Sequence, residues 1–157
     1  MQQKAITLRK ANWSDVGFYL LLRNDITVRN SSFNKNLVDF GVHNNWFKNK
    51  LRDSSSFLYV VETVHKRAGQ IRFDIENNQA EVHISILPEF RGRGTAVLAL
   101  KKACRLIFSK NPGTNLITAH IKLNNSASRK SFLNAGFKEA NLKLIHHNRC
   151  IEMVLER

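Results

Sequence analysis

Pro88-Glu89-Phe90-Arg91-Gly92-Arg93-Gly94-Thr95-Ala96 is the stretch that decides the fold, because the hydrophobic pattern changes across it. Before it, residues 81–87 alternate between polar and apolar side chains, as expected of a β-strand. After it, residues 94–109 place apolar side chains three and four positions apart, as expected of a helix. A glycine-rich loop at such a boundary turns tightly and presents the N–H groups of residues 91–96 at the positive end of the helix dipole. The stretch is therefore a candidate anion-binding loop, and an ordinary strand-to-helix turn is the alternative interpretation.

The loop differs from two well-known phosphate-binding motifs. It lacks the Gly-Lys-Ser/Thr ending of a P-loop and has a single residue, Arg93, between Gly92 and Gly94. It also lacks the dinucleotide-binding fingerprint, because Val97 occupies the position of the third glycine. Arg91 and Arg93 add positive charge beside the N–H groups. The loop thus indicates an anionic ligand without identifying it.

The hydrophobic patterns of the remaining chain predict further strands and helices. Strands are expected at residues 6–9, 57–61, 69–75, 116–121, 137–145 and 150–155, and helices beginning at Ser14 or Asp15, over 42–51, and from Asn125 or Ser126 to Ala135. The strands at 57–61, 69–75 and 81–87 form a predicted antiparallel meander with a hairpin turn at Asn77-Asn78. The strand-helix-strand order from Glu81 to Ile121 predicts a parallel pair with a right-handed crossover.

The charge of the chain indicates the kind of partner it attracts. Its 157 residues include 25 Lys and Arg against 12 Asp and Glu, which gives a formal net charge of +13. Such a charge attracts nucleic acid, anionic membranes or phosphorylated small molecules. The basic residues are spread from Arg9 to Arg157 rather than gathered on one helix or tail, so a nucleic-acid partner is not required. A solvated basic surface without a special role is the alternative.

Composition also limits the class and the location of the protein. Hydrophobic residues make up 43% of the chain, and no apolar run approaches the ~20 residues of a membrane span. The start, Met1-Gln2-Gln3-Lys4-Ala5, lacks the apolar stretch of a secretory signal. Cys104 and Cys150 are too few for a disulfide framework. We therefore expect a reduced, cytoplasmic protein with no membrane segment, folded as one domain over residues 1–157.

No metal site is expected. Metal-ligand spacing is absent among His43, His65, His120, His146 and His147. His120 shares an alternating strand face with Thr118 and Lys122, and a packed or solvated histidine is the favoured interpretation there.

Two motifs in the expected elements resemble the GNAT N-acetyltransferase superfamily. Arg91-Gly92-Arg93-Gly94-Thr95-Ala96 matches Arg/Gln-x-x-Gly-x-Gly/Ala, the acetyl-CoA pyrophosphate loop of that family. Asn125-x-x-Ser128-x-x-x-Phe132-x-x-x-Gly136-Phe137 is similar to its Asn-x-x-Ser…Gly-Phe element. The resemblance covers nearly the whole chain. It implies an α+β fold with a mixed, mostly antiparallel, twisted sheet of about seven strands, helices on both faces and one splayed parallel pair.

The resemblance also implies acetyl-CoA as cosubstrate, and hence an N-acetyltransferase. By position, exposed backbone of Ser85 and Ile86 would bind the pantetheine arm. The N–H groups of Arg91, Gly92, Arg93, Gly94, Thr95 and Ala96 would bind the pyrophosphate. Asn125 would meet the pantetheine or its thioester end. An acceptor amine would then attack the thioester directly in a ternary complex.

Glu81 is the candidate general base, and His83 is its rival. Both share a predicted strand face with Ser85, so all three are expected to line the cleft. A carboxylate with an ordinary pKa of about 4 needs desolvation or a water relay to act at neutral pH, whereas the ordinary pKa of histidine is about 6.5. A solvated residue on the strand face is the alternative for each.

The chain departs from the family at Phe132, where many members have a tyrosine that protonates the departing thiolate. Phenylalanine has no proton to give, so Ser128, Ser131 or water would replace it. Its helical context favours a packing role for Phe132.

The N-terminal third resembles two branches of the family, in Leu22-Arg23-Asn24-Asp25 and in His43-x-x-Trp46-Phe47. One branch acetylates nucleotide-linked amino sugars and the other acetylates the N-termini of ribosomal proteins. Residues 69–74 and 84–86 favour the sugar branch. Arg72 is expected either to bind a substrate phosphate or to form a salt bridge with Asp74, and Trp46 either to bind substrate or to pack in the core.

A second class of function also remains open. The chain would then be a non-catalytic module that keeps the fold and binds RNA or ribosomes through its basic surface. Members of the family often form homodimers, so a homodimer is an expectation of the resemblance as well.

Overall fold

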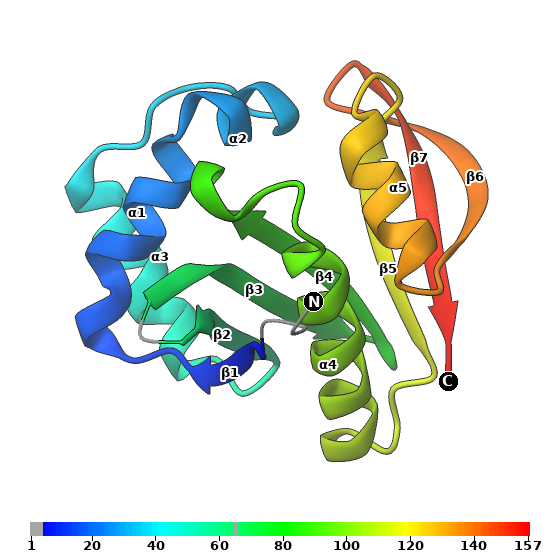
Figure 1. Ribbon diagram of the computed structural model, residues 1–157, viewed down its shortest axis with the longest axis horizontal. Coiled ribbons are helices and arrows are strands. Elements are labelled where there is room, and N and C mark those ends of the chain that lie inside the picture. Colours follow the sequence, from blue (N-terminus) through cyan, green and yellow to red (C-terminus); the bar gives the residue numbers. More distant parts are fainter. Residues whose placement is uncertain (1–4, 65) are drawn as a thin grey trace.

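The computed structural model describes residues 5–64 and 66–157 (Figure 1). The start of the chain at residues 1–4 and His65, both named above, lie outside the described residues. The strands are β1 (Thr7–Lys10), β2 (Ser56–Thr63), β3 (Lys66–Glu76), β4 (Gln79–Ile86), β5 (Leu116–Lys122), β6 (Lys138–Ile145) and β7 (Asn148–Glu156). The α-helices are α1 (Val16–Asn24), α2 (Ile26–Ser31), α3 (Phe40–Arg52), α4 (Thr95–Lys110) and α5 (Ser126–Asn134). Short 3-10 turns occupy Trp13–Asp15 and Pro88–Phe90.

In the described part of the chain the strands form one seven-stranded sheet in the order β1-β2-β3-β4-β5-β7-β6. Neighbouring strands are antiparallel except for β4 and β5, which are parallel and joined through α4. This confirms the predicted mixed sheet with one parallel pair.

The parallel pair diverges soon after it starts. β4 pairs with β5 only from Gln79 to Glu81, opposite residues 116–118. Beyond that point β4 runs on to Ile86 and β5 to Lys122 as separate strands (Figure 1). The splayed pair is therefore confirmed, and it leaves one edge of β4 without a neighbouring strand.

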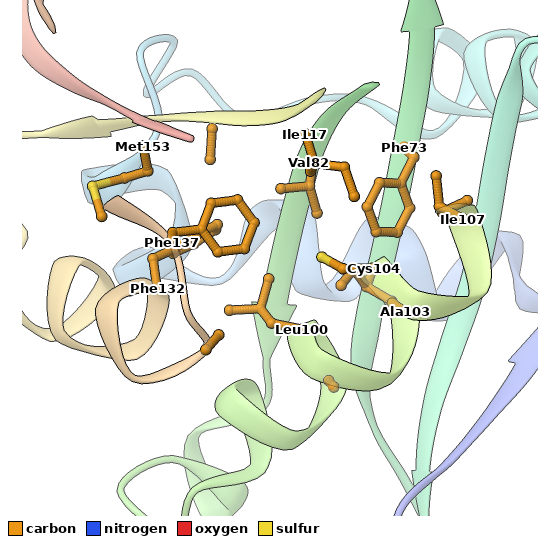
Figure 2. Close-up of a cluster of buried hydrophobic side chains, with 14 of the residues drawn as sticks. Phe73, Val82, Leu100, Ala103, Cys104, Ile107, Ile117, Phe132, Phe137 and Met153 are labelled. Atoms are coloured by element: carbon orange, nitrogen blue, oxygen red, sulfur yellow. The ribbon is translucent and has the colours of Figure 1, made fainter. Parts of the chain in front are cut away.

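Helices cover both faces of the sheet, as predicted. Tyr59 and Val61 of β2 belong to the main core, which α4 and α5 cover. Leu58 and Val60 point to the opposite face, where they pack with residues of α1 and α3. This alternation follows from the two-residue period of a strand. In Figure 2 side chains of α4 and α5 meet those of the central strands in the main core.

Local signals explain most of the turns and helix starts. Asn77 and Asn78 both have positive φ, at 49° and 63°, as a tight hairpin turn requires. The six-residue α2 begins after Asp25, because the Asp25 side chain accepts hydrogen bonds from the N–H groups of Thr27 and Val28.

Candidate active site

The start of α4 has backbone N–H groups without acceptors among the described residues. Gly94 precedes the helix with a φ of 76°, and no side chain caps it. The helical ladder begins with the bond from Leu98 N to Gly94 O, so the N–H groups of residues 95–97 have no acceptor within the helix. A Cβ added at Gly92 or Gly94 would meet nothing within 4 Å, so a ligand can approach this backbone closely. These features fit a bound diphosphate.

Arg91 holds the loop rather than projecting freely. Its Nε donates to Ile86 O at 2.8 Å, and its Nη2 donates to Asp25 Oδ1 at 3.0 Å. Its backbone N–H donates to Pro88 O, so among residues 91–96 this one N–H is already used. Arg93, by contrast, is exposed. The loop is thus tied to the start of α2 by an ion pair between Arg91 and Asp25.

The open edge of β4 supplies further backbone groups. Leu87 N donates to Ala68 O, which belongs to β3. Because backbone groups alternate in direction along a strand, Ser85 also faces β3, whereas Ile84 and Ile86 face the side from which β5 has diverged. The N–H of Ile86 therefore faces the opening between β4 and β5, whereas its carbonyl oxygen already accepts from Arg91 Nε. The hydroxyl of Ser85 accepts from Gln70 on β3 at 3.4 Å.

Asn125 and Ser128 lie together at the start of α5. Asn125 Oδ1 caps the helix by accepting from Ser128 N at 3.2 Å, which leaves its amide nitrogen for a ligand. Ser131 Oγ donates to Ala127 O within the helix. Phe132 is 3% exposed and packs edge-to-face on Phe137, with ring centroids 4.9 Å apart (Figure 2). Phe132 is therefore a core residue.

The predicted base and its rival lie beside each other where β4 and β5 begin to part. Glu81 Oε1 is 3.8 Å from His83 Nε2. The same oxygen is 2.9 Å from His120 Nδ1 on β5. The Glu81 and His83 side chains are 41% and 39% exposed, so both remain accessible to a substrate. Sequence reasoning did not select His120 for this cluster.

The surroundings lower the pKa of both Glu81 and His83. The hydrogen bond from His120 lowers the pKa of Glu81, burial opposes this, and the net pKa lies below the ordinary value. Burial and the positive charge of Arg72 lower the pKa of His83, against the opposing effect of Glu81. Glu81 is thus ionised and His83 neutral at neutral pH.

Arg72 lies on β3, directly opposite His83 in the β3–β4 register. Its Nε is 3.3 Å from Asp74 Oδ2, so the expected alternative of a salt bridge is present. Its guanidinium carbon also lies 5.1 Å from the centroid of a Trp46 ring. Trp46 is half-buried and packs near Phe47, with ring centroids 6.3 Å apart, so it contributes both to packing and to the wall beside Arg72.

The described residues contain neither a helix that could span a membrane nor a cluster that could hold a metal ion. Across residues 5–64 and 66–157, no helix has the length and apolar character to cross a bilayer. Over the same residues, no three His, Cys, Asp or Glu side chains are arranged to hold a metal ion.

The N–H groups at the start of α4 and the open edge of β4 are the features expected of a transferase that uses an acyl-CoA. Residues 5–138 match a family model described as an acetyltransferase (GNAT) domain. Because this match covers most of the chain, the chain belongs to the GNAT acetyltransferase family, and the predicted family is confirmed. It is thus an N-acetyltransferase with acetyl-CoA as cosubstrate.

Solved structures with the same fold include two kinds of acetyltransferase. Spermidine N-acetyltransferase from Vibrio cholerae, in complex with CoA and spermine, is 20% identical, with a TM-score of 0.86 over 96% of this chain and 95% of that chain. Aminoglycoside acetyltransferase AAC(6′)-Ib, in complex with coenzyme A, is 13% identical, with a TM-score of 0.84 over 98% and 95%. At these identities the likeness concerns the fold alone. No curated protein matches the sequence significantly.

Proposed function

We propose that this N-acetyltransferase acts on the primary amine of a small acceptor that also carries an anionic group, and we favour a nucleotide-linked amino sugar. The observation that carries the proposal is the cationic character of the face around His83. The polyamine and the aminoglycoside bound in the similar structures, spermine and kanamycin, are cations that such a face would repel.

Arg72 lies opposite His83 in the β3–β4 register, and its positive charge acts on both His83 and Arg23. The Nη2 atom of Arg23 donates to Asn34 O at 3.0 Å, whereas its buried Nη1 has no hydrogen-bond partner among the described residues. Burial and the nearby charges of Arg29 and Arg72 lower the pKa of Arg23. Like charges held together in this way favour an anion between them.

Lys122 adds a further positive charge from β5. It is 6% exposed, and its Nζ donates to Asn30 O in α2 at 3.2 Å. Burial and the neighbouring Lys35 lower the pKa of Lys122. By contrast, the carboxylate of Asp74 is neutralised by Lys50 at 2.6 Å as well as by Arg72, so it offers little attraction to a cationic acceptor.

The acetyl-CoA site rests on the backbone at the start of α4 and on the edge of β4. The N–H groups of residues 95–97 would hold the diphosphate, and the outward-facing backbone of Ile84 and Ile86 would align the pantetheine arm. The amide nitrogen of Asn125 would donate to the ligand at the same opening. When bound, acetyl-CoA supplies an activated acetyl group that passes to nitrogen as the CoA thiol leaves.

Glu81 is the proposed general base. Its Oε1 is shared by two imidazoles, so Oε2 remains for the acceptor ammonium or for a water molecule that carries its proton. His83, kept neutral, lies on the same face and can accept a hydrogen bond from the amine. Phe132 cannot protonate the leaving thiolate, so that proton comes from Ser128 or from water.

A thiol-release assay tests the proposal. Acetyl-CoA is incubated with a panel of nucleotide-linked amino sugars, polyamines, amino acids and peptide N-termini. We expect the sugar nucleotides to be acetylated fastest, with rates that fall as salt is raised. Glu81→Gln should reduce turnover about 100-fold or more, whereas Glu76→Gln, at an exposed site on β3, should not.

Two outcomes would contradict the acceptor proposal. Faster acetylation of spermidine or of peptide N-termini would refute the anionic acceptor. A missing rise in melting temperature with acetyl-CoA, together with salt-sensitive RNA binding, would favour the non-catalytic module instead.

A further inference from the structure

Three side chains form a line across adjacent strands at the point where β4 and β5 part. Glu81 lies on β4, His120 on β5 and Glu152 on β7. His120 Nδ1 is 2.9 Å from Glu81 Oε1, and His120 Nε2 is 3.6 Å from Glu152 Oε1. His120 and Glu152 are direct partners in the β5–β7 register, so the sheet itself fixes their separation. The imidazole therefore stands between two carboxylates.

His120 and Glu152, at one end of this line, are largely buried, and residues of β6 hold Glu152 in place. The His120 side chain is 15% exposed, and its Nε2 is buried without a hydrogen-bond partner among the described residues. The Glu152 side chain is 12% exposed. Its carboxylate accepts hydrogen bonds from Lys143 Nζ at 2.5 Å and from Asn141 Nδ2 at 3.2 Å, both on β6. With those contacts Glu152 cannot easily turn away, so its carboxylate stays beside the imidazole.

We propose that His120 is a positioning residue for acetyl transfer: in its doubly protonated form, Nε2–H faces the Glu152 carboxylate, which orients the ring, and Nδ1–H donates to Glu81 Oε1. This inference rests on the proposed role of Glu81 as the base. The bond fixes the carboxylate and leaves Oε2 directed at the acceptor nitrogen. During the reaction the proton moves from that nitrogen to Glu81, while His120 keeps both of its protons.

The charges around Glu81 come from each neighbouring strand. On β3, Asp74 is the partner of Glu81 in the register, and the positive charge of Arg72 helps to lower the pKa of Glu81. On β4, His83 acts in the same direction. The hydrogen bond from His120 is the largest of these effects, so its loss should raise the pKa of Glu81.

Two substitutions at His120 separate its two nitrogens. The amide nitrogen of asparagine takes the place of Nδ1, so His120→Asn keeps a donor toward Glu81. The amide nitrogen of glutamine takes the place of Nε2, so His120→Gln loses that donor. With an acceptor found in the thiol-release panel, we expect His120→Gln to lower kcat about 10- to 100-fold, and His120→Asn to retain most of kcat. His147→Asn, in the exposed turn between β6 and β7, is the matched control with unchanged kcat.

A second measurement needs no acceptor and so separates this inference from the proposed function. The carboxyl carbon of Glu81, labelled with ¹³C and assigned with Glu81→Gln, is titrated by NMR in the free protein. The wild-type titration should lie below the ordinary glutamate pKa of about 4.3. It should move to higher pH in His120→Gln and stay low in His120→Asn.

The kcat comparison and the Glu81 titration each support or refute the positioning role of His120. Equal kcat in His120→Gln and His120→Asn, with both folded by circular dichroism, would overturn the positioning role. An unchanged Glu81 titration in His120→Gln would remove its physical basis. If the panel yields no acceptor but the titration shifts as stated, the proposed function fails while the Glu81–His120–Glu152 arrangement stands.

Discussion

Gly69 lies on β3 where no side chain fits, and its substitution should disturb the cofactor edge of β4. A Cβ at this position would overlap Ser85 O, and would lie 2.7 Å from Ile86 Cδ1 and 3.1 Å from Ile86 Cα. Two of these atoms belong to the backbone of β4, so the strand itself must shift. Overpacking of this kind costs about 1–3 kcal/mol. For a chain of this size such a loss lowers Tm by roughly 2–12 °C.

The assay for Gly69→Ala is thermal unfolding with and without CoA. We expect a lower Tm and a smaller rise in Tm on addition of CoA, because the displaced segment includes Ile86. Gly17→Ala is the matched control: in α1 an added Cβ meets nothing within 4 Å, so stability should rise by about 0.5–1 kcal/mol. If Gly69→Ala and Gly17→Ala gave the same Tm, the reasoning about close strand contact would be refuted.

Three further predictions concern the core, the ion pair and the loop. Phe132→Tyr should lower the free energy of unfolding by about 1–3 kcal/mol in urea titration without raising kcat, because a buried hydroxyl gains no partner; a faster enzyme would contradict the packing role. Burial raises the pKa of Asp25, but hydrogen bonds from Arg91 and backbone N–H groups outweigh it, so the net pKa is lowered. Asp25→Asn keeps the helix cap and should therefore lower the free energy of unfolding by only ~1 kcal/mol at neutral pH. This difference from the wild type should disappear as pH falls through the lowered pKa of Asp25. A difference that grew in acid would contradict this sign. Gly94→Ala forces a φ of 76° on a residue with a side chain, which costs about 1–2 kcal/mol; we also expect weaker CoA binding by calorimetry, and unchanged affinity would contradict the loop assignment.

The sequence predicted the main features of the fold because they depend on local periodicity. The two-residue alternation in 81–87 and the helical spacing after Gly94 both reappear as β4 and α4. The hairpin at Asn77-Asn78 follows from residues that tolerate positive φ. Such signals lie within a few residues of one another, so a single sequence reveals them.

The site was predicted less completely because its contacts join distant parts of the chain. Glu81 and His83 were selected, but His120 lies 39 residues from Glu81 and reaches it only through the short parallel pairing of β4 with β5. Arg91 and Asp25 are 66 residues apart, and no local pattern indicates that they pair. The register of a sheet decides such contacts, and register depends on every strand between them.

The edge strand β6 shows what a hydrophobic pattern does not predict. Residues 137–145 were predicted as a strand from their hydrophobic pattern, and β6 forms there. However, Leu142 and Leu144 are 62% and 69% exposed, so their face packs on no helix in the described part of the chain. A strand pattern can identify an element without showing whether anything covers it.

We propose that backbone N–H groups at the start of α4 bind the diphosphate of acetyl-CoA. A ¹⁵N–¹H NMR titration with CoA measures those groups one by one. We expect saturable shifts that are largest for Thr95, Ala96 and Val97, with further shifts at Ile84 and Ile86. Unchanged resonances at the start of α4, at millimolar CoA or while other residues shift, would contradict it.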